Sequence, residues 1–476
     1  MLTTEAAAKK LGISRRRVIA LINSGVLQAE RFGKSWMIDD NSVKQRIANP
    51  VKRGRPLMGD SNSNNFQSYS LMNKNTKICD FIYNTHENMV AKINHFNGDV
   101  PASFGIYSSP NRINSFALTH WIKERCVPSI RPSLPKILLS DNALSPIDLM
   151  FKSFGLNLSD QYWFQPSGYD LDWNKINCFD NIFKTTTHTF SNSGIKSLSY
   201  SYPDASTPGE LDKYWVKDKD GTNYLYKSGS SLDNREPYSE VLAAKLLSRI
   251  LPKSEYVAYT MTAQDGHIWS VCPSFITTDA ELVPAADIFS YFGHSNKDPY
   301  QQYRDNCNEL GIKNISTALD KMIICDFLMS NPDRHTYNFG LIRDSNTGKF
   351  LSSAPLFDNG AAFGSRQNYY DIEHNFPYIA HPFNEYPLTQ LGYAKDYSWL
   401  NLSALDGFEV EIQNTLSLNS AMDEKIITCI SNNFLHNVST VSDFQKQHQR
   451  IRSFSIPNQN HSVRVKPPVH KSGKCR

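Results

Sequence analysis

The chain has 476 residues, of which 40% are hydrophobic and 20% are charged. This length exceeds what one hydrophobic core usually serves, so we expect several domains with the composition of a globular protein. No apolar run reaches the roughly 20 residues needed to cross a bilayer, and no basic segment followed by an apolar core opens the sequence. We therefore expect a cytoplasmic protein with no signal peptide and no membrane partner.

The net charge of +4 is unevenly distributed along the chain. Residues 1–56 contain 12 Lys or Arg and 4 Asp or Glu, a net charge of +8, so the remainder carries −4. A basic head on a mildly acidic body indicates a polyanionic partner for the head alone. The eight cysteines are scattered and form no C-x-x-C pair, so the sequence predicts neither a zinc site nor a disulfide framework.

Residues 1–48 predict a compact module of two helices and a hairpin. In TTEAAAKKLGISRRRVIALINSG, Thr4 is expected to cap the first helix, Gly12 to form the turn and Ser14 to cap the second helix. The following segment, LQAERFGKSWMI, alternates around residues 32–34 as the two strands of a β-hairpin do.

Three consecutive arginines, Arg15, Arg16 and Arg17, begin the second helix, where a recognition helix meets the major groove. Lys34, in the hairpin turn, adds a further basic side chain. The module resembles the excisionase and MerR-like winged helix-turn-helix family, and the resemblance implies double-stranded DNA as a partner. The alternative is a small helical domain whose basic face is merely solvated.

Residues 49–67 are predicted to be a linker with a basic stretch, KRGRP at 52–56, and a polar run after it. An extended Arg-Gly-Arg segment fits a narrow minor groove, with Arg53 and Arg55 inserted and the glycine close to the groove floor. The stretch resembles an AT-hook core. A plain basic linker is the equal alternative.

The rest of the chain divides by pattern. Residues 68–194 are rich in Trp, Tyr and Phe and carry no motif that we can assign to chemistry. Residues 195–285 predict strands in YWVKDKDGTNYLYK and on both sides of an Asp-Gly turn, with EPYSEVLAAKLLSRI as a helix between them. Residues 286–456 predict mainly helices, with short strands around NFGLIR and APLFD, and the basic tail 457–476 is expected to be disordered.

The strongest chemical pattern is NPDRHTYNFG at 331–340 followed by APLFDNG at 354–360. Phosphoryl transfer needs a carboxylate that orients the attacking hydroxyl, together with an amide and a second carboxylate that hold Mg²⁺ on the nucleotide phosphates. Asp-x₄-Asn, a strand and then Phe-Asp-x-Gly supply these groups in protein-kinase order. We therefore predict Asp333 as the catalytic base and Asn338 and Asp358 as metal ligands. The alternative is a polar loop followed by an ordinary turn.

Upstream residues supply the other parts of such a site. Lys227 ends a predicted strand and is expected to contact the α- and β-phosphates, and Glu240 lies 13 residues later, where it would pair with Lys227. Ser206, Thr207 and Gly209 precede the first strand, where a phosphate-covering loop belongs. This segment is no G-x-G-x-x-G, so a plain polar turn stays open as an alternative.

Residues 206–363 resemble HipA-like serine/threonine kinases, and the DRH-x-x-N box is also similar to that of phosphoinositide kinases. The resemblance implies an α+β, bilobal protein-kinase-like fold that uses ATP and Mg²⁺ and acts on a protein substrate. It also implies a toxin or stress regulator with an antitoxin partner, which usually carries the DNA-binding function, so a fused module would be a variation. The Gly-rich loop of well-known members has no clear match, which leaves regulation by autophosphorylation there open.

Two further functions stay open at this stage. One is a DNA-binding transcriptional regulator whose kinase-like domain only senses nucleotide, and the other is a soluble small-molecule kinase. The complete set of Asp333, Asn338, Asp358 and Lys227 argues against the sensor, because a degraded kinase often loses at least one of them. No membrane-binding segment supports a lipid substrate.

Overall fold

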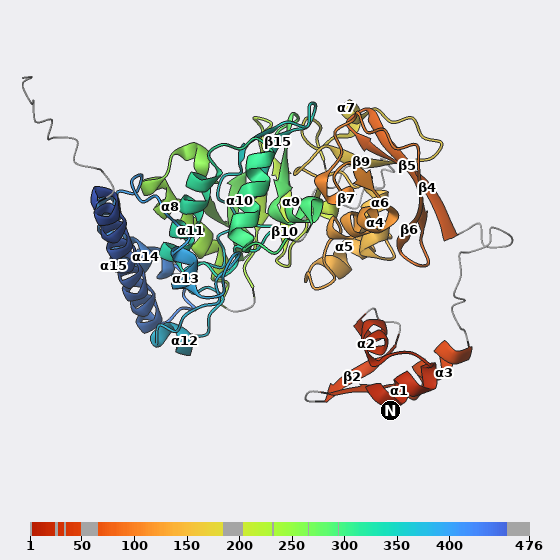
Figure 1. Cartoon of the computed structure of the whole chain (residues 1–476), viewed down its shortest axis with the longest axis horizontal. Helices are drawn as coiled ribbons and strands as arrows, with labels where there is room; N and C mark the ends of the chain where they lie inside the picture. The colour runs from red at the N-terminus through yellow and green to blue at the C-terminus, as the bar shows by residue number, and fades with distance from the viewer. Residues whose placement is uncertain are drawn as a thin grey trace, which may run out of the picture. The chain divides into compact units, whose positions relative to one another are not determined.

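The chain folds into two units, Met1–Ser63 and Asn64–Arg476, which are described separately below (Figure 1). The computed structural model describes residues 2–23, 27–32, 35–48, 65–183, 203–230, 233–264, 266–293 and 295–454. Lys34, Arg53, Arg55 and the basic tail therefore lie outside the described residues. None of the helices within these ranges has the length and apolar character that crossing a membrane requires.

The first unit is a winged helix-turn-helix. Its elements are β1 (Leu2–Thr3), α1 (Thr4–Leu11), α2 (Arg15–Asn23), β2 (Ala29–Phe32), β3 (Ser35–Ile38) and α3 (Asp40–Ala48), and the sheet order is β1-β3-β2. Gly12 ends α1 in the left-handed conformation, with φ +64°, as the predicted turn requires. A core of its own holds the unit together, and it includes Ala7, Val18, Leu21, Ile22 and Ile38.

One predicted cap in this unit is wrong by a single residue. The side chain of Thr3, not Thr4, accepts a hydrogen bond from the backbone N–H of Ala6 at 3.2 Å. Thr3 has extended backbone angles whereas Thr4 is already helical, and a capping residue must lie outside the helix. Ser14 occupies the capping position of α2, where its Oγ accepts from the N–H of Arg17 at 3.3 Å.

The second unit begins with an antiparallel sheet of order β6-β5-β4-β9. Its strands are β4 (Phe66–Asn73), β5 (Thr76–Asn84), β6 (Met89–Asn94) and β9 (Tyr162–Pro166). Three short helices accompany it, α4 (Ser115–Glu124), α5 (Leu134–Ser140) and α6 (Pro146–Lys152), and aromatic side chains fill the core between sheet and helices. Since β4 starts at Phe66, it begins before the position where the linker was expected to end.

A second antiparallel sheet has the order β10-β11-β13-β12. It consists of β10 (Lys213–Lys217), β11 (Asn223–Lys227), β13 (His267–Pro273) and β12 (Thr260–Gln264). Helix α8 (Glu236–Ile250) packs against β12 and β13 and is buried over most of its length. Both predicted strand pairs and the helix between them are therefore present.

A third sheet, β14-β15-β16, connects this part to the helices. Its strands are β14 (Ala280–Pro284), β15 (Gly340–Asp344) and β16 (Phe350–Ser353). The strand predicted at APLFD is wrong, because the chain pairs with β15 before that segment and Leu356 makes only an isolated bridge with Tyr256. Gly340 lies against β14 so closely that a Cβ there would come within 2.2 Å of the Val283 carbonyl oxygen.

The remaining chain is mainly helical, and its helices share one core with α8 (Figure 1). They are α9 (Ala285–Phe292), α10 (Pro299–Glu309), α11 (Ile315–Met329), α12 (Tyr369–Glu373), α13 (Pro387–Leu391), α14 (Phe408–Leu416) and α15 (Glu424–Phe454). Helix α11 is apolar on nearly all sides and is buried, as expected of a central helix. The sheet of β10 to β13 with α8 and this helical part form the two lobes of an α+β fold.

Candidate active site

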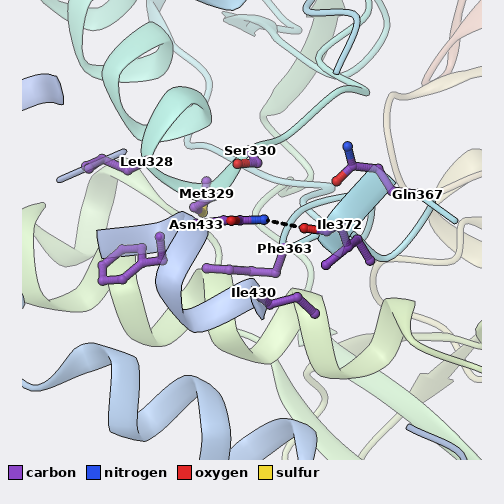
Figure 2. Close-up of a pocket in the computed structure, with 10 residues that line it drawn as sticks. Leu328, Met329, Ser330, Phe363, Gln367, Ile372, Ile430 and Asn433 are labelled. Carbon is purple, nitrogen blue, oxygen red and sulfur yellow. Dashed lines mark hydrogen bonds between the residues drawn. The ribbon is translucent and has the colours of Figure 1, made fainter. Parts of the chain in front are cut away.

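The described residues of the second unit line a small cavity and a much larger one. Figure 2 shows the smaller one, of about 20 Å³, where Asn433 of α15 donates to the carbonyl oxygen of Ile372 at 3.0 Å. That volume holds about one water molecule, so it has no room for a nucleotide. The larger cavity is a cleft of about 900 Å³. It is lined by all eight predicted nucleotide-site and catalytic residues: Ser206, Thr207, Gly209, Lys227, Glu240, Asp333, Asn338 and Asp358.

Lys227 forms ion pairs with two carboxylates in the cleft. Strand β11 ends at this residue, and its Nζ lies 2.9 Å from Oε1 of Glu240 on α8 and 2.9 Å from Oδ1 of Asp358. The hydroxyl of Tyr259 lies 3.2 Å from the same nitrogen. The structure thus brings together three predicted residues that are far apart in sequence.

The charges of this group depend on one another. Burial would lower the pKa of Lys227, but the carboxylates of Asp358 and Glu240 outweigh it and raise that pKa well above its usual range. Burial would raise the pKa of Asp358, yet the Lys227 and Lys213 ammonium groups hold it well below the usual range. Burial raises the pKa of Glu240. A protonated Lys227 therefore faces an ionised Asp358 at neutral pH.

Asp333 lies in the loop that follows α11, on the helical side of the cleft. Nη1 of Arg366 lies 3.2 Å from its Oδ2, and Nε2 of His335 lies 3.9 Å from its Oδ1. Burial raises the pKa of Asp333 although Arg366 and His335 oppose this effect. A carboxylate with a raised pKa is a better proton acceptor than an ordinary one, so the environment suits a general base.

Arg334 holds the loop of Asp333 and the segment of Asp358 in one arrangement. Its guanidinium is fully buried and pairs with Asp326 of α11, with Nη2 2.9 Å from Oδ1. It also donates to the carbonyl oxygens of Asn338 at 2.8 Å and Phe357 at 2.6 Å, and to the side chain of Asn359. Sequence reasoning missed this role. The available signal was a charged residue, Asp326, inside the otherwise apolar stretch 322–329 that ends α11.

The donor set of the cleft fits a Mg²⁺ ion that is held together with a nucleotide. Among the described residues, no group of three or more His, Cys, Asp or Glu side chains is arranged to bind a metal without other ligands. Mg²⁺ is usually held by one or two carboxylates plus phosphate oxygens, so a full protein cage is not required. Asn338 donates its Nδ2 to the Asp333 carbonyl oxygen at 2.8 Å. This bond leaves its Oδ1 as the atom suited to a metal, in the cleft that the anionic Asp358 also lines.

Residues 206–209 lie along the cleft and are held from the region of residues 68–194. The buried guanidinium of Arg131 donates to the carbonyl oxygen of Gly209 at 2.8 and 3.1 Å and to that of Thr207 at 2.5 Å. The backbone N–H of Ser133 donates to Asp212 at 2.9 Å. A region without a recognisable motif therefore positions the predicted phosphate loop. No local pattern in the sequence predicts this contact, because Arg131 lies more than 70 residues before the loop.

The first unit presents its predicted DNA-contacting arginines to solvent. Arg15, Arg16 and Arg17 are all exposed in the first turn of α2. Glu5 lies 3.9 Å from Arg15, and both side chains are largely exposed, so this pair holds Arg15 only weakly.

The family model described as a helix-turn-helix domain matches residues 1–49. No curated protein matches the chain. A solved structure of the proinflammatory kinase CtkA from Helicobacter pylori is 16% identical, with 52% of this chain and 97% of that chain covered and a TM-score of 0.39. A solved structure of HipA, in a toxin–antitoxin complex with HipB and operator DNA from Shewanella oneidensis MR-1, is 11% identical. The match covers 80% of this chain and 99% of that chain, with a TM-score of 0.42.

Proposed function

We propose that the second unit is an ATP- and Mg²⁺-dependent serine/threonine protein kinase. The observation that carries this proposal is the placement of Lys227, Glu240 and Asp358 in one ion-pair group, in the same cleft as Asp333 and Asn338. A lysine paired with a helix glutamate, beside a metal-binding aspartate and a loop aspartate, is the set that phosphoryl transfer requires.

Each residue has a definite part in the proposed reaction. Lys227 binds phosphate oxygens of the nucleotide, and Glu240 fixes the position of its ammonium group. Asp358 and Asn338 would hold Mg²⁺, which would neutralise charge on the phosphates. Asp333 orients the acceptor hydroxyl and takes its proton as the new bond from the hydroxyl oxygen to the γ-phosphorus forms, while the bond from the γ-phosphorus to the β,γ-bridging oxygen breaks and ADP leaves. Arg334 keeps the two loops in register while this happens.

For the first unit we propose binding of double-stranded DNA by the first turn of α2. The exposed Arg15, Arg16 and Arg17 and the net charge of +8 on residues 1–56 support it. A role as a growth-arresting toxin, an antitoxin partner and a cytoplasmic location stay predictions.

The proposed activity is tested with γ-labelled ATP and a lysate of the host. Wild-type protein should transfer label to serine or threonine of one or a few proteins in the presence of Mg²⁺, and Asp333→Ala should not. Nucleotide binding without transfer to any acceptor would favour the nucleotide-sensing regulator. Transfer only to acceptors of low molecular mass would favour the small-molecule kinase.

A further inference from the structure

A second lysine, Lys213, lies in the cleft beside Lys227. The two residues are directly opposite in the antiparallel pairing of β10 with β11. Side chains of directly opposite residues project from the same face of a sheet, and like charges there repel one another. Both lysines line the same cleft. The sheet thus carries an unfavourable pair of cations at the edge of the site.

The two lysines differ in how their charge is balanced. Lys227 has Glu240 and Asp358 at 2.9 Å. Within the described part of the chain, no ion pair joins Lys213 to a carboxylate. A third cation, Arg131, also lies close enough to influence Lys213. Asp358 and Glu240 pair directly with Lys227, and Asp204 and Asp212 favour the charged form of Arg131. Asp358 and Glu240 act on Lys213 only at longer range.

The ammonium group of Lys213 lies against the loop of residues 206–209. A Cβ built on Gly209 would come within 2.1 Å of Nζ of Lys213, so the absence of a side chain at position 209 leaves room for the lysine. Gly209 also has a φ of +108°, which other residues rarely adopt. The loop that Arg131 holds thus leaves space beside Gly209 for this ammonium group.

The surroundings of Lys213 lower its proton affinity. Burial, together with the nearby Lys227 and Arg131, lowers its pKa to about 7 although Asp358 and Glu240 oppose the effect. An anion placed between the lysines would offset both the repulsion and the loss of hydration.

We propose that Lys213 is a second phosphate-binding residue, which together with Lys227 forms a two-lysine clamp on the polyphosphate of a nucleoside triphosphate. The inference rests on the proposed kinase function for the identity of the ligand. It adds a residue to the site and gives a reason for the glycine at position 209. It also explains the Arg131 contacts, since they position the loop against which the Lys213 ammonium group lies.

The test is a set of binding titrations on full-length protein with ATP, adenosine and inorganic tripolyphosphate. The variants are wild type, Lys213→Met and a matched control, Lys219→Met. Lys219 is an exposed lysine in the turn between β10 and β11. Because a charge-assisted contact contributes about 1.5–3 kcal/mol, Lys213→Met should weaken binding of ATP and of tripolyphosphate by about tenfold or more. Adenosine affinity should stay unchanged, and Lys219→Met should behave as wild type with all three ligands.

The three ligands distinguish failure of the two-lysine clamp from failure of the proposed nucleotide binding. Wild-type affinity of Lys213→Met for ATP and tripolyphosphate would overturn the clamp and leave the kinase proposal intact. An equal loss for adenosine and ATP would also overturn it, because Lys213 would then support the fold of the cleft and not the phosphates. If wild type bound tripolyphosphate but neither ATP nor adenosine, the nucleotide function would fail while the effect of Lys213→Met on tripolyphosphate still decided the clamp. Binding of none of the three would overturn both.

Discussion

Lys227 and Asp358 are 131 residues apart in the sequence, yet Nζ of the lysine lies 2.9 Å from Oδ1 of the aspartate. The contact joins the last residue of β11 in the sheet lobe to the loop that follows β16 in the helical lobe. Glu240 shares the same ammonium group and accepts from the backbone N–H of Asn359 at 2.9 Å. The lysine proposed to bind nucleotide and the carboxylate proposed to bind metal are therefore held by one charge network across the cleft.

Lys227→Met should destabilise the fold as well as abolish activity. The substitution leaves Glu240, which is 2% exposed, without its ion-pair partner. Breaking a buried pair in this way costs about 3 kcal/mol or more. Urea unfolding should show the loss, and the double variant Lys227→Met/Glu240→Gln should recover part of it because the unpaired charge is gone. Equal stability of wild type and Lys227→Met would contradict the network.

Asp287 should make stability fall with rising pH. Burial and the nearby Glu281, Asp160 and Glu124 raise its pKa to about 7, although Arg343 opposes the shift. Between the pKa of an ordinary aspartate and pH 7 the folded state therefore binds more protons than the unfolded state, so folding weakens as pH rises through that window. Asp287→Asn should be more stable than wild type at pH 8 by several kcal/mol, since each pKa unit between 3.8 and about 7 corresponds to about 1.4 kcal/mol. The difference should vanish below about pH 4.

The measurement for Asp287 is the difference between the two unfolding curves at several pH values. Taking this difference removes the contributions of all other titrating groups that the variants share. A stability difference that is constant from pH 4 to pH 8 would show that the Asp287 carboxyl titrates as it does in water.

Local patterns in the sequence predicted the elements that local physics determines. The helix in EPYSEVLAAKLLSRI begins at Glu236 and ends at Ile250 as predicted, and both strand pairs around it are present. The spacing of Asp333, Asn338 and Asp358 indicated a shared site because a loop, a strand and a second loop can place such residues together, and all three line the cleft.

Contacts between distant segments could not be predicted in the same way. Arg131 lies in a region without a motif and contacts Thr207 and Gly209 only after both segments have folded. Lys213 lies in the predicted strand, but its position opposite Lys227 depends on the register of the pair. The strand expected at APLFD is absent because β16 (Phe350–Ser353), which precedes that segment, already pairs with β15.

DNA binding by residues 1–56 should depend steeply on salt. Their net charge of +8 implies several phosphate contacts with release of counterions, so affinity should fall by orders of magnitude between about 50 and 200 mM salt. Arg15→Ala/Arg16→Ala should weaken binding to every duplex and relax the preference at particular base pairs. Fluorescence anisotropy with labelled duplexes measures both effects. Binding that is absent at low salt, or indifferent to salt, would rule out DNA as the partner.

Deletion of residues 1–63 should leave a folded protein that turns over ATP but no longer binds DNA. Each unit has its own hydrophobic core, and the cut lies before β4 begins at Phe66. Turnover of the truncated and full-length proteins should agree, with and without DNA. A change of several-fold on deletion or on addition of DNA would show instead that the basic head gates the cleft. A folded but inactive truncated protein would show that the second unit needs the first unit for activity and would contradict their independence.

The proposed kinase function requires that the cleft transfer phosphoryl groups with a metal held by Asp358. Its most direct test is the Mg²⁺-dependent rate of γ-phosphoryl transfer by purified wild type and Asp358→Ala, with the fold of each checked by thermal unfolding. Asn338→Ala provides a graded comparison. We predict transfer by wild type that requires Mg²⁺, none by Asp358→Ala at saturating Mg²⁺, and a milder loss in Asn338→Ala, because only the carboxylate carries a full charge to the metal. Near wild-type turnover by Asp358→Ala at saturating Mg²⁺ would contradict the assignment of this site.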